Sequence, residues 1–439
     1  MGGSGGGADC TSVLCDKRDQ TCPQDCFTLN WAKRAGSGQQ QFAHGVAIDA
    51  NGNVALAGEY HDRPFNFGTA AATLLTDSDT KDGTAFTEGF VAYYGATGDP
   101  QWALSMGVPT ISIATRRVAN SVVFNSNNHV VVVGQAASNI MGAPRAFIRQ
   151  MDPADPTNGM KGWLANSFVG ESVESEALAV TTDMTEVYVV GRTASQSTLS
   201  CGSTNGIALD RGLTIVKYGA NGACLWVQSM NTVMTSSALP TAISARKSGT
   251  DGVWIAGTYS SPIAVNPLPG LMTAGTSTFV INLAGDSGAV RSAIGIAHGG
   301  GILVPTAIES IGNGSNGSGS VWLVGQMGGK TGLSQELVDT NQTAAFVSRI
   351  DVTAATAPTT TPATFTHTTK LIVGPQGTAG ARGTGIYLKH PKLYVAGTFA
   401  TGVTLPQGTS VLHAGNVPFL ATINADTLDL VAFDSFATG

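Results

Sequence analysis

A β-strand that ends in glycine recurs six times along this chain, and no other feature restricts the possible folds as strongly. The six glycines, called the marker glycines below, lie 57 to 76 residues apart, which is too long for one hairpin and fits a four-stranded unit with its loops. The copies are NVALAGEY (53–60), HVVVVGQA (129–136), EVYVVGRT (186–193), GVWIAGTY (252–259), SVWLVGQM (320–327) and KLYVAGTF (392–399), with marker glycines Gly58, Gly134, Gly191, Gly257, Gly325 and Gly397.

Three further strands complete each unit. An apolar strand and a turn precede the marker strand, as in VAIDANGN (46–53), where Asn51 and Gly52 suit the left-handed conformation of a tight hairpin. A fourth strand often begins with an aromatic residue, as around Trp102, Trp163 and Trp226. The third strands are expected at 90–94, 147–151, 213–218, 279–283, 346–350 and 419–423.

Six such units predict an all-β fold, a β-propeller of six four-stranded blades. A single four-stranded sheet would expose two apolar faces and two edges, and radial packing of the blades buries the faces. The marker glycine is expected to let the backbone turn away tightly, or to make room for an aromatic residue of a neighbouring blade.

The fourth-strand pattern occurs seven times, so seven blades are the alternative count. LNWAKRA (29–35) precedes the first blade and LDLVAFDSF (428–436) follows the last, and one of these terminal strands is expected to close the ring. The other is surplus. It either adds a fifth strand to one blade or pairs with the sheet edge of another subunit, which would give self-assembly.

Composition excludes several partners and structures. Charged residues make up 12% of the chain, Gly reaches 56, and the net charge is −6 without a run of Lys or Arg. Long helices are not expected from this composition, and neither is binding to nucleic acid or to an anionic membrane surface. No apolar run approaches the roughly eighteen residues of a membrane-spanning helix.

The repeat pattern also resembles a known family. D-x-x-G-N, an apolar strand, G-x-[YF], F-V-x-x and W-A together resemble the bacterial SBBP-type β-propeller repeat proteins, over about nine tenths of the chain. The match is best in the first repeat and weakens in the fifth and sixth, where the fourth-strand Trp is replaced. The resemblance implies an extracellular or cell-envelope location and a binding or structural role.

Six cysteines fall into two clusters, which predicts three disulfides and an oxidising compartment. The spacing C-x4-C-x6-C-x3-C of the first cluster leaves its pairing open. It lacks the paired C-x2-C of zinc sites, so four zinc thiolates are the less favoured interpretation. CDKRDQTCPQDC also resembles short modules ending in CPxDC in secreted bacterial surface proteins. The clusters are Cys10, Cys15, Cys22 and Cys26, then Cys201 and Cys224.

The chain divides into a Gly/Ser leader (1–9), a Cys-rich segment (10–28) and one propeller domain (29–439). The leader MGGSGGG has the composition of the flexible stretch that follows the acylated cysteine of a bacterial lipoprotein, and equally that of a cloning linker. Our hypothesis is that the protein is exported. If it is an outer-membrane lipoprotein, only its lipid anchor contacts the membrane.

No catalytic motif is present. The chain has no G-x-S-x-G elbow, P-loop, H-E-x-x-H or Rossmann glycine pattern, so no catalytic residue and no cofactor are predicted. The loop with Asp77, Asp79 and Asp82 lacks the distal Glu of a calcium-binding EF-hand, and the oxygen ligands of DANGN (49–53) are what a hairpin turn requires. No metal site is predicted.

Scarce polar side chains are expected in the loops that enter the inner strands of five of the six blades, and in propellers these loops line one mouth of the channel. They suit a polar ligand such as a glycan or a peptide, and they also suit ion pairs that only solvate the channel. These candidate ligand-binding residues are Gln41, His44, Arg116, Arg117, Glu174, Glu176, His298 and Arg382.

The sequence therefore predicts an exported, non-enzymatic propeller for binding or scaffolding, with an unidentified protein or glycan partner. Two alternatives remain: a carbohydrate-active hydrolase or lyase at the channel mouth, and a structural subunit of a surface filament or sheath. The Ser/Thr/Pro-rich stretch 353–369 is expected to be a long loop within the fifth blade.

Overall fold

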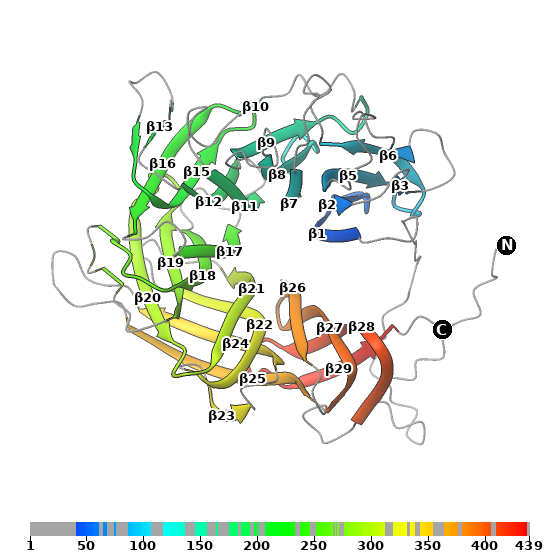
Figure 1. The fold of residues 1–439 in the computed structure, drawn as a ribbon, viewed down its shortest axis with the longest axis vertical. Helices are drawn as coiled ribbons and strands as arrows, with labels where there is room; N and C mark the ends of the chain where they lie inside the picture. Colours follow the sequence, from blue (N-terminus) through cyan, green and yellow to red (C-terminus); the bar gives the residue numbers. More distant parts are fainter. Residues whose placement is uncertain are drawn as a thin grey trace.

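The structure is a computed structural model of the whole chain. It describes residues 41–436 except 61–64, 68–73, 76–86, 107–116, 137–144, 156–163, 166–174, 183–185, 194–196, 200, 202–206, 233–237, 246–251, 267, 269, 272–275, 312–318, 332–333, 339–342, 354–363, 376–379 and 405–409. The described part is all-β, with six four-stranded antiparallel blades arranged as a six-bladed β-propeller (Figure 1). It contains no helix long and apolar enough to cross a membrane.

Strands follow chain order from the centre of each blade outward, and the first strand of every blade lines the centre of the ring (Figure 1). The six inner strands are β1 (Gln41–Ile48), β7 (Arg117–Phe124), β11 (Ser175–Thr182), β17 (Ala238–Ala245), β21 (Ile302–Ile311) and β26 (Ala381–Lys389). The marker strands are β2 (Val54–Tyr60), β8 (Val130–Ala136), β12 (Val187–Thr193), β18 (Gly252–Tyr259), β22 (Gly319–Thr331) and β27 (Lys392–Thr404).

The two outer strands of each blade also agree with the sequence pattern. The third strands are β5 (Glu88–Tyr94), β9 (Arg145–Met151), β15 (Gly212–Tyr218), β19 (Ser277–Ala284), β24 (Ala344–Thr353) and β28 (Ser410–Asn424). The outermost strands are β6 (Pro100–Ser105), β10 (Leu164–Ala165), β16 (Cys224–Asn231), β20 (Val290–Ala297), β25 (Thr364–Pro375) and β29 (Leu430–Ser435). Five short strands decorate the blades: β3 (Phe65–Asn66), β4 (Leu74–Leu75), β13 (Ser197–Leu199), β14 (Ile207–Leu209) and β23 (Ser334–Val338).

The marker glycines have a different role from the predicted one. Each lies opposite a bulge in the inner strand, where the register shifts. A Cβ on Gly58 would collide with the carbonyl oxygen of Phe42 and with the ring of Phe90. A Cβ on Gly134 or Gly397 would collide with the equivalent carbonyl oxygen and phenylalanine ring of its own blade. The strand continues past the glycine, and the aromatic ring belongs to the same blade. Bulge and ring together exclude any side chain.

The first hairpin contains the turn that the sequence predicts at DANGN. The Asp49 carboxylate accepts hydrogen bonds of 2.8 Å from the backbone N–H groups of Asn51 and Asn53. Burial raises the pKa of Asp49, but bonds from the Asn53 and Asn128 side chains and from these backbone groups outweigh it and hold the pKa below its ordinary value. Gly52 has φ +83°, whereas Asn51 does not take the predicted left-handed conformation.

Apolar clusters between neighbouring blades form the core. Blades 1 and 2 share Val91, Trp102 and Val132, and blades 4 and 5 share Trp254, Ile294 and Leu323. Equivalent clusters join blades 2 and 3, 3 and 4, and 5 and 6. The fold thus places its buried faces between the sheets, as radial packing requires.

Two expectations about the chain path are settled or corrected. β29, from the C-terminal segment, is the outer strand of blade 6, while residues 29–35 lie outside the described residues, as does Trp163. The Ser/Thr/Pro-rich stretch is not all loop, because its residues 364–369 belong to β25 and pair with β24. Thr and Phe have high strand propensity, and the backbone of this stretch forms an antiparallel ladder with the edge of β24.

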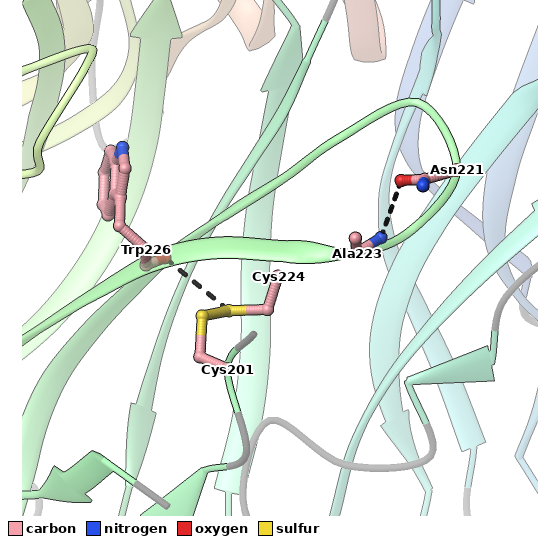
Figure 2. Close-up of a disulfide and its surroundings, with 5 residues drawn as sticks. All are labelled: Cys201, Asn221, Ala223, Cys224 and Trp226. Atoms are coloured by element: carbon pink, nitrogen blue, oxygen red, sulfur yellow. Dashed lines mark hydrogen bonds between the residues drawn. A yellow bond between two sulfur atoms is a disulfide. The ribbon is translucent and has the colours of Figure 1, made fainter. Parts of the chain in front are cut away.

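One of the three predicted disulfides lies among the described residues. Cys201 and Cys224 are bonded, with Cα atoms 4.8 Å apart (Figure 2). The bridge ties the segment between β13 and β14 to the start of the outer strand β16, and β14 contacts β16. The four N-terminal cysteines lie outside the described residues, so their two bridges stay a prediction.

Removing this bridge by the double substitution Cys201→Ser/Cys224→Ser is expected to lower the free energy of unfolding by about 3 kcal/mol. The bridged residues are 23 apart, and opening a loop of that size returns conformational entropy to the unfolded chain. Urea unfolding with and without a reducing agent measures the loss, and reduction of the double variant isolates any effect of the other cysteines. An unchanged unfolding midpoint would contradict the prediction.

Candidate functional site

The predicted site residues lie on strands more than on loops. Gln41, His44, Arg117, Glu176 and Arg382 all lie within inner strands around the channel (Figure 1). Arg116 and Glu174 lie outside the described residues, and His298 lies in the connection between β20 and β21. Inner strands of a propeller run in the same direction, so their first residues gather at one mouth of the channel.

Arg117 does not contribute to an open mouth. It is 2% exposed, and its Nη1 lies 3.7 Å from Oε1 of Glu88, which is 4% exposed. The other oxygen of Glu88 accepts hydrogen bonds of 2.8 Å from the hydroxyls of Tyr60 and Ser105. Burial, and to a lesser extent the charge of Arg117, lowers the pKa of Arg149. The sequence could not show this cluster, because its five residues come from five different strands: Arg117, Glu88, Tyr60, Ser105 and Arg149.

His298 is also buried and has a structural position. Its Nε2 lies 3.0 Å from Oγ1 of Thr278, and that hydroxyl donates a 3.0 Å hydrogen bond to the carbonyl of Leu303. Because Thr278 has one proton to give, Nε2 of His298 is the donor in their bond. Burial lowers the pKa of His298, which favours this neutral form. The contact joins blade 4 to the start of β21 in blade 5.

Gln41 and His44 do lie at the mouth, at the start of β1. The His44 ring stacks on Phe42, with ring centroids 6.4 Å apart, and its Nε2 lies 3.7 Å from Oε1 of Glu59. Glu59 follows the marker glycine Gly58 directly. The sequence left open that polar side chains at the mouth only pair with one another, and His44 and Glu59 form such a pair. Both side chains keep some exposure.

A polar residue follows the marker glycine in every blade, and the sequence analysis missed this regularity. Successive side chains of a strand point to opposite faces, so these six lie on the blade face opposite the glycine. Each pairs in register with an inner-strand residue near the mouth, for example Glu59 with Phe42 and Arg192 with Glu176. The six are Glu59, Gln135, Arg192, Thr258, Gln326 and Thr398, and all are at least partly exposed.

Three apolar side chains near the start of inner strands are also exposed. Phe42 is 45% exposed, Leu239 37% and Ile302 40%, and each is the first or second residue of its inner strand. Arg382 of β26 pairs with Thr398 as Phe42 pairs with Glu59, and it is exposed too. We call Phe42, Leu239, Ile302, Arg382 and the six polar residues the mouth surface.

Two buried polar atoms at the mouth lack a hydrogen-bond partner within the described chain. They are Nε2 of Gln41, at the start of β1, and Oε1 of Gln135, in the mouth surface. Buried amide groups are nearly always hydrogen-bonded in folded proteins, so each of these atoms can bind a polar group of a ligand or a water. They add directional contacts to the apolar and charged groups around them.

In the part of the chain that the structure describes, no three His, Cys, Asp or Glu side chains are placed to hold a metal ion. No protein-family model matches this chain, and no characterised protein is similar to it in sequence. The resemblance to the SBBP-type repeats therefore stays a prediction from the repeat motifs, and the conclusion that stands is a six-bladed β-propeller with a polar and apolar channel mouth.

Proposed function

We propose that this propeller is an exported binding protein, without catalysis, that holds an extended peptide at its mouth surface. A propeller fold suits binding or scaffolding in general. The observation that carries the proposal is the exposure of Phe42, Leu239 and Ile302 at one end of the channel, among charged and amide groups. Exposed large apolar side chains that gather with polar groups are typical of binding sites.

The chemistry of the mouth surface favours a peptide over a glycan. Leu239 and Ile302 are aliphatic and offer no ring for a sugar to stack on, but they suit apolar peptide side chains. Arg192, Arg382 and Glu59 can pair with charged residues of either sign, and the free amide atoms of Gln41 and Gln135 can bond to a peptide backbone. Export is supported by the disulfide Cys201–Cys224, which fits an oxidising compartment.

The test is a peptide array and a glycan array probed with the full chain, followed by affinity measurements on the best ligand. The double variant Phe42→Ala/Leu239→Ala is expected to bind at least about tenfold more weakly, because such anchors contribute 1–2 kcal/mol or more each. The matched control is Leu225→Ala, on the outer strand β16, where the side chain is 48% exposed and far from the channel. It should bind normally.

Two results would overturn the proposal. One is a peptide ligand whose affinity is the same for the double variant and for the unchanged protein, which would place the binding site elsewhere. The other is binding to glycans only, which would replace the peptide by a carbohydrate. Turnover of any arrayed glycan by the full chain would favour the hydrolase or lyase instead.

A further inference from the structure

The seam between blades 6 and 1 lacks the packing of the other five seams of the ring. Buried apolar clusters join blades 1 to 2, 2 to 3, 3 to 4, 4 to 5 and 5 to 6. Among the described residues, no such cluster contains side chains of both blade 6 and blade 1, and the sixth cluster belongs to blade 1 alone. The inner strands β1 and β26 flank this seam (Figure 1).

The blade 1 side of the seam is an exposed apolar wall. Ala55 of β2 packs toward blade 2, so its neighbours Val54 and Leu56 lie on the opposite face, toward blade 6. Their register partners on β1 are Ile48 and Val46, which are 68% and 64% exposed. Blade 1 therefore presents aliphatic side chains to the seam.

The exposure of Val46 is not found at the equivalent position of the next four blades. That position lies opposite the residue two before the marker glycine, and its side chain is 9% exposed or less in each of these blades. There the preceding blade covers it as part of a shared cluster. Val46 lacks this cover, so its wall is open to a ligand. The four counterparts are Val122, Val180, Ile243 and Ile308.

The blade 6 side of the seam is apolar and aromatic. Leu393 and Val395 of β27 pack on blade 5, so Tyr394 between them lies on the opposite face, toward blade 1. Tyr387 of β26 pairs in register with Tyr394 and stacks on its ring, with centroids 6.3 Å apart. Tyr387 is 62% exposed, and Ala396, the next residue of β27 on this face, is exposed as well.

A cation without an acid partner lies at the mouth end of the blade 6 wall. Arg382 pairs in register with Thr398 and so lies on the same face as Tyr387. It is exposed, and it forms no ion pair with any described residue. On the facing wall of blade 1, Nε2 of Gln41 has no hydrogen-bond partner within the described chain. Both groups are donors, so they suit an acceptor, and the charge of Arg382 favours an anionic one.

One acid lies on the same face of blade 6, but far from the inner strand. Asp434 of β29 follows Phe433, which packs on blade 5, and it pairs in register with Leu420. β27 and β28 separate β29 from β26, so at about 4.8 Å per strand Asp434 is roughly 14 Å from β26. We therefore assign the ligand to the inner strands, where Arg382 determines the charge.

The length of the seam and its chemistry favour an aliphatic chain. Arg382 lies opposite the residue after its marker glycine, and Ile48 lies opposite the residue four before its own. These five register positions correspond to roughly 17 Å. The exposed side chains along this length are mainly apolar or aromatic, so a peptide backbone there would lose hydrogen bonds to water without replacement. A methylene chain has no such groups and gains from apolar burial.

We propose that the seam between blades 6 and 1 binds one long-chain carboxylate. The head group pairs with Arg382, and the aliphatic chain runs between Tyr387 on one side and Val46 and Ile48 on the other. One strand flanks the seam on each side, which suits one chain better than the two of a phospholipid. This site goes beyond the peptide site proposed above, because Val46, Ile48 and Tyr387 lie outside the mouth surface.

The experiment uses the full chain and a dansyl-labelled undecanoate, whose fluorescence rises in an apolar site. Dodecanoate is expected to displace this probe at one molecule per chain. Dodecanol has the same chain without the charge and is expected to displace it at least about tenfold less well, because it loses the charge-assisted bond. Arg382→Gln should abolish this difference between acid and alcohol.

A charge on the apolar wall tests the position of the chain. Val46→Asp is expected to weaken dodecanoate binding at least about tenfold, because the chain would cover a carboxylate. Val46 is largely exposed, so the variant should fold. The matched control is Leu225→Asp on the outer strand β16, where the side chain is 48% exposed, and it should bind dodecanoate normally.

Several results would overturn the proposal. They are a lack of displacement by dodecanoate, equal losses for Val46→Asp and Leu225→Asp, and equal displacement by dodecanoate and dodecanol. Loss of the difference with Lys389→Gln, at the far end of β26, in place of Arg382→Gln would contradict the assigned head group. Binding of phosphatidylglycerol vesicles without dodecanoate would replace the ligand, and dimers in light scattering without probe binding would assign the seam to a second copy.

Discussion

Gly257→Val is expected to lower the free energy of unfolding by about 4 kcal/mol, close to the limit that a protein of ordinary stability tolerates. A Cβ at this position would overlap the carbonyl oxygen of Leu239 and lie 2.6 Å from the Phe279 ring and 2.7 Å from Cα of Pro240. Two of these three obstacles are backbone of the neighbouring inner strand, which cannot rotate away. Chemical denaturation followed by tryptophan fluorescence measures the loss.

Gly385→Val is the matched control for this steric argument. Gly385 also lies in a strand beside a bulge, but a Cβ there would meet only the Cβ of Ala396, at 4.0 Å. Valine has a higher strand propensity than glycine and restricts the unfolded chain, so the control should be neutral or more stable by up to about 1 kcal/mol. Similar losses for both variants would show that strand glycines matter here for another reason than the bulge and the ring.

Glu88→Ala is expected to cost about 3–5 kcal/mol. It leaves the buried guanidinium of Arg117 without its carboxylate and removes the acceptor of the Tyr60 and Ser105 hydroxyls. The like charge of Arg149, which acts on Arg117, makes the loss larger. The free energy of unfolding from urea denaturation at neutral pH checks the value.

Two variants separate the charge from the packing at this cluster. Glu88→Gln keeps the size of the side chain and one acceptor oxygen but loses the charge, so it should cost less than Glu88→Ala. The double variant Glu88→Leu/Arg117→Met removes both charges and should recover much of the stability, because apolar replacement of a whole buried ion pair is often neutral. A cost below about 1 kcal/mol for Glu88→Ala would contradict the assignment of a buried ion pair.

The repeat unit could be predicted because its signals are local. Alternating apolar residues, the Asn51–Gly52 turn and the marker glycines specify strands and hairpins within short stretches of chain, and the expected marker and third strands agree with the structure in all six blades. The role of the marker glycine was wrong in detail, because the bulge opposite it depends on pairing with the inner strand. The prediction of a loop at 364–369 was wrong as well, because it was made from composition alone and these residues pair with β24.

The candidate site was predictable only in part. Of the residues predicted in the loops at the channel mouth, Gln41, His44 and Arg382 lie near the start of inner strands and keep some exposure. Phe42, Leu239 and Ile302 read as ordinary strand residues, and only their exposure in the ring distinguishes them from buried counterparts such as Val118. The polar residue after each marker glycine was visible in the sequence and could have indicated the mouth surface.

By itself, the sequence determined the class of fold and the strands of each repeat unit, and it favoured six blades over seven, because these follow from patterns a few residues long that recur along the chain. The tertiary structure alone decided that Arg117 is buried beside Glu88 while Arg382 is exposed, and that β29 completes blade 6. Burial and pairing of that kind depend on partners up to hundreds of residues away, and local patterns contain no information about which distant face a side chain will meet.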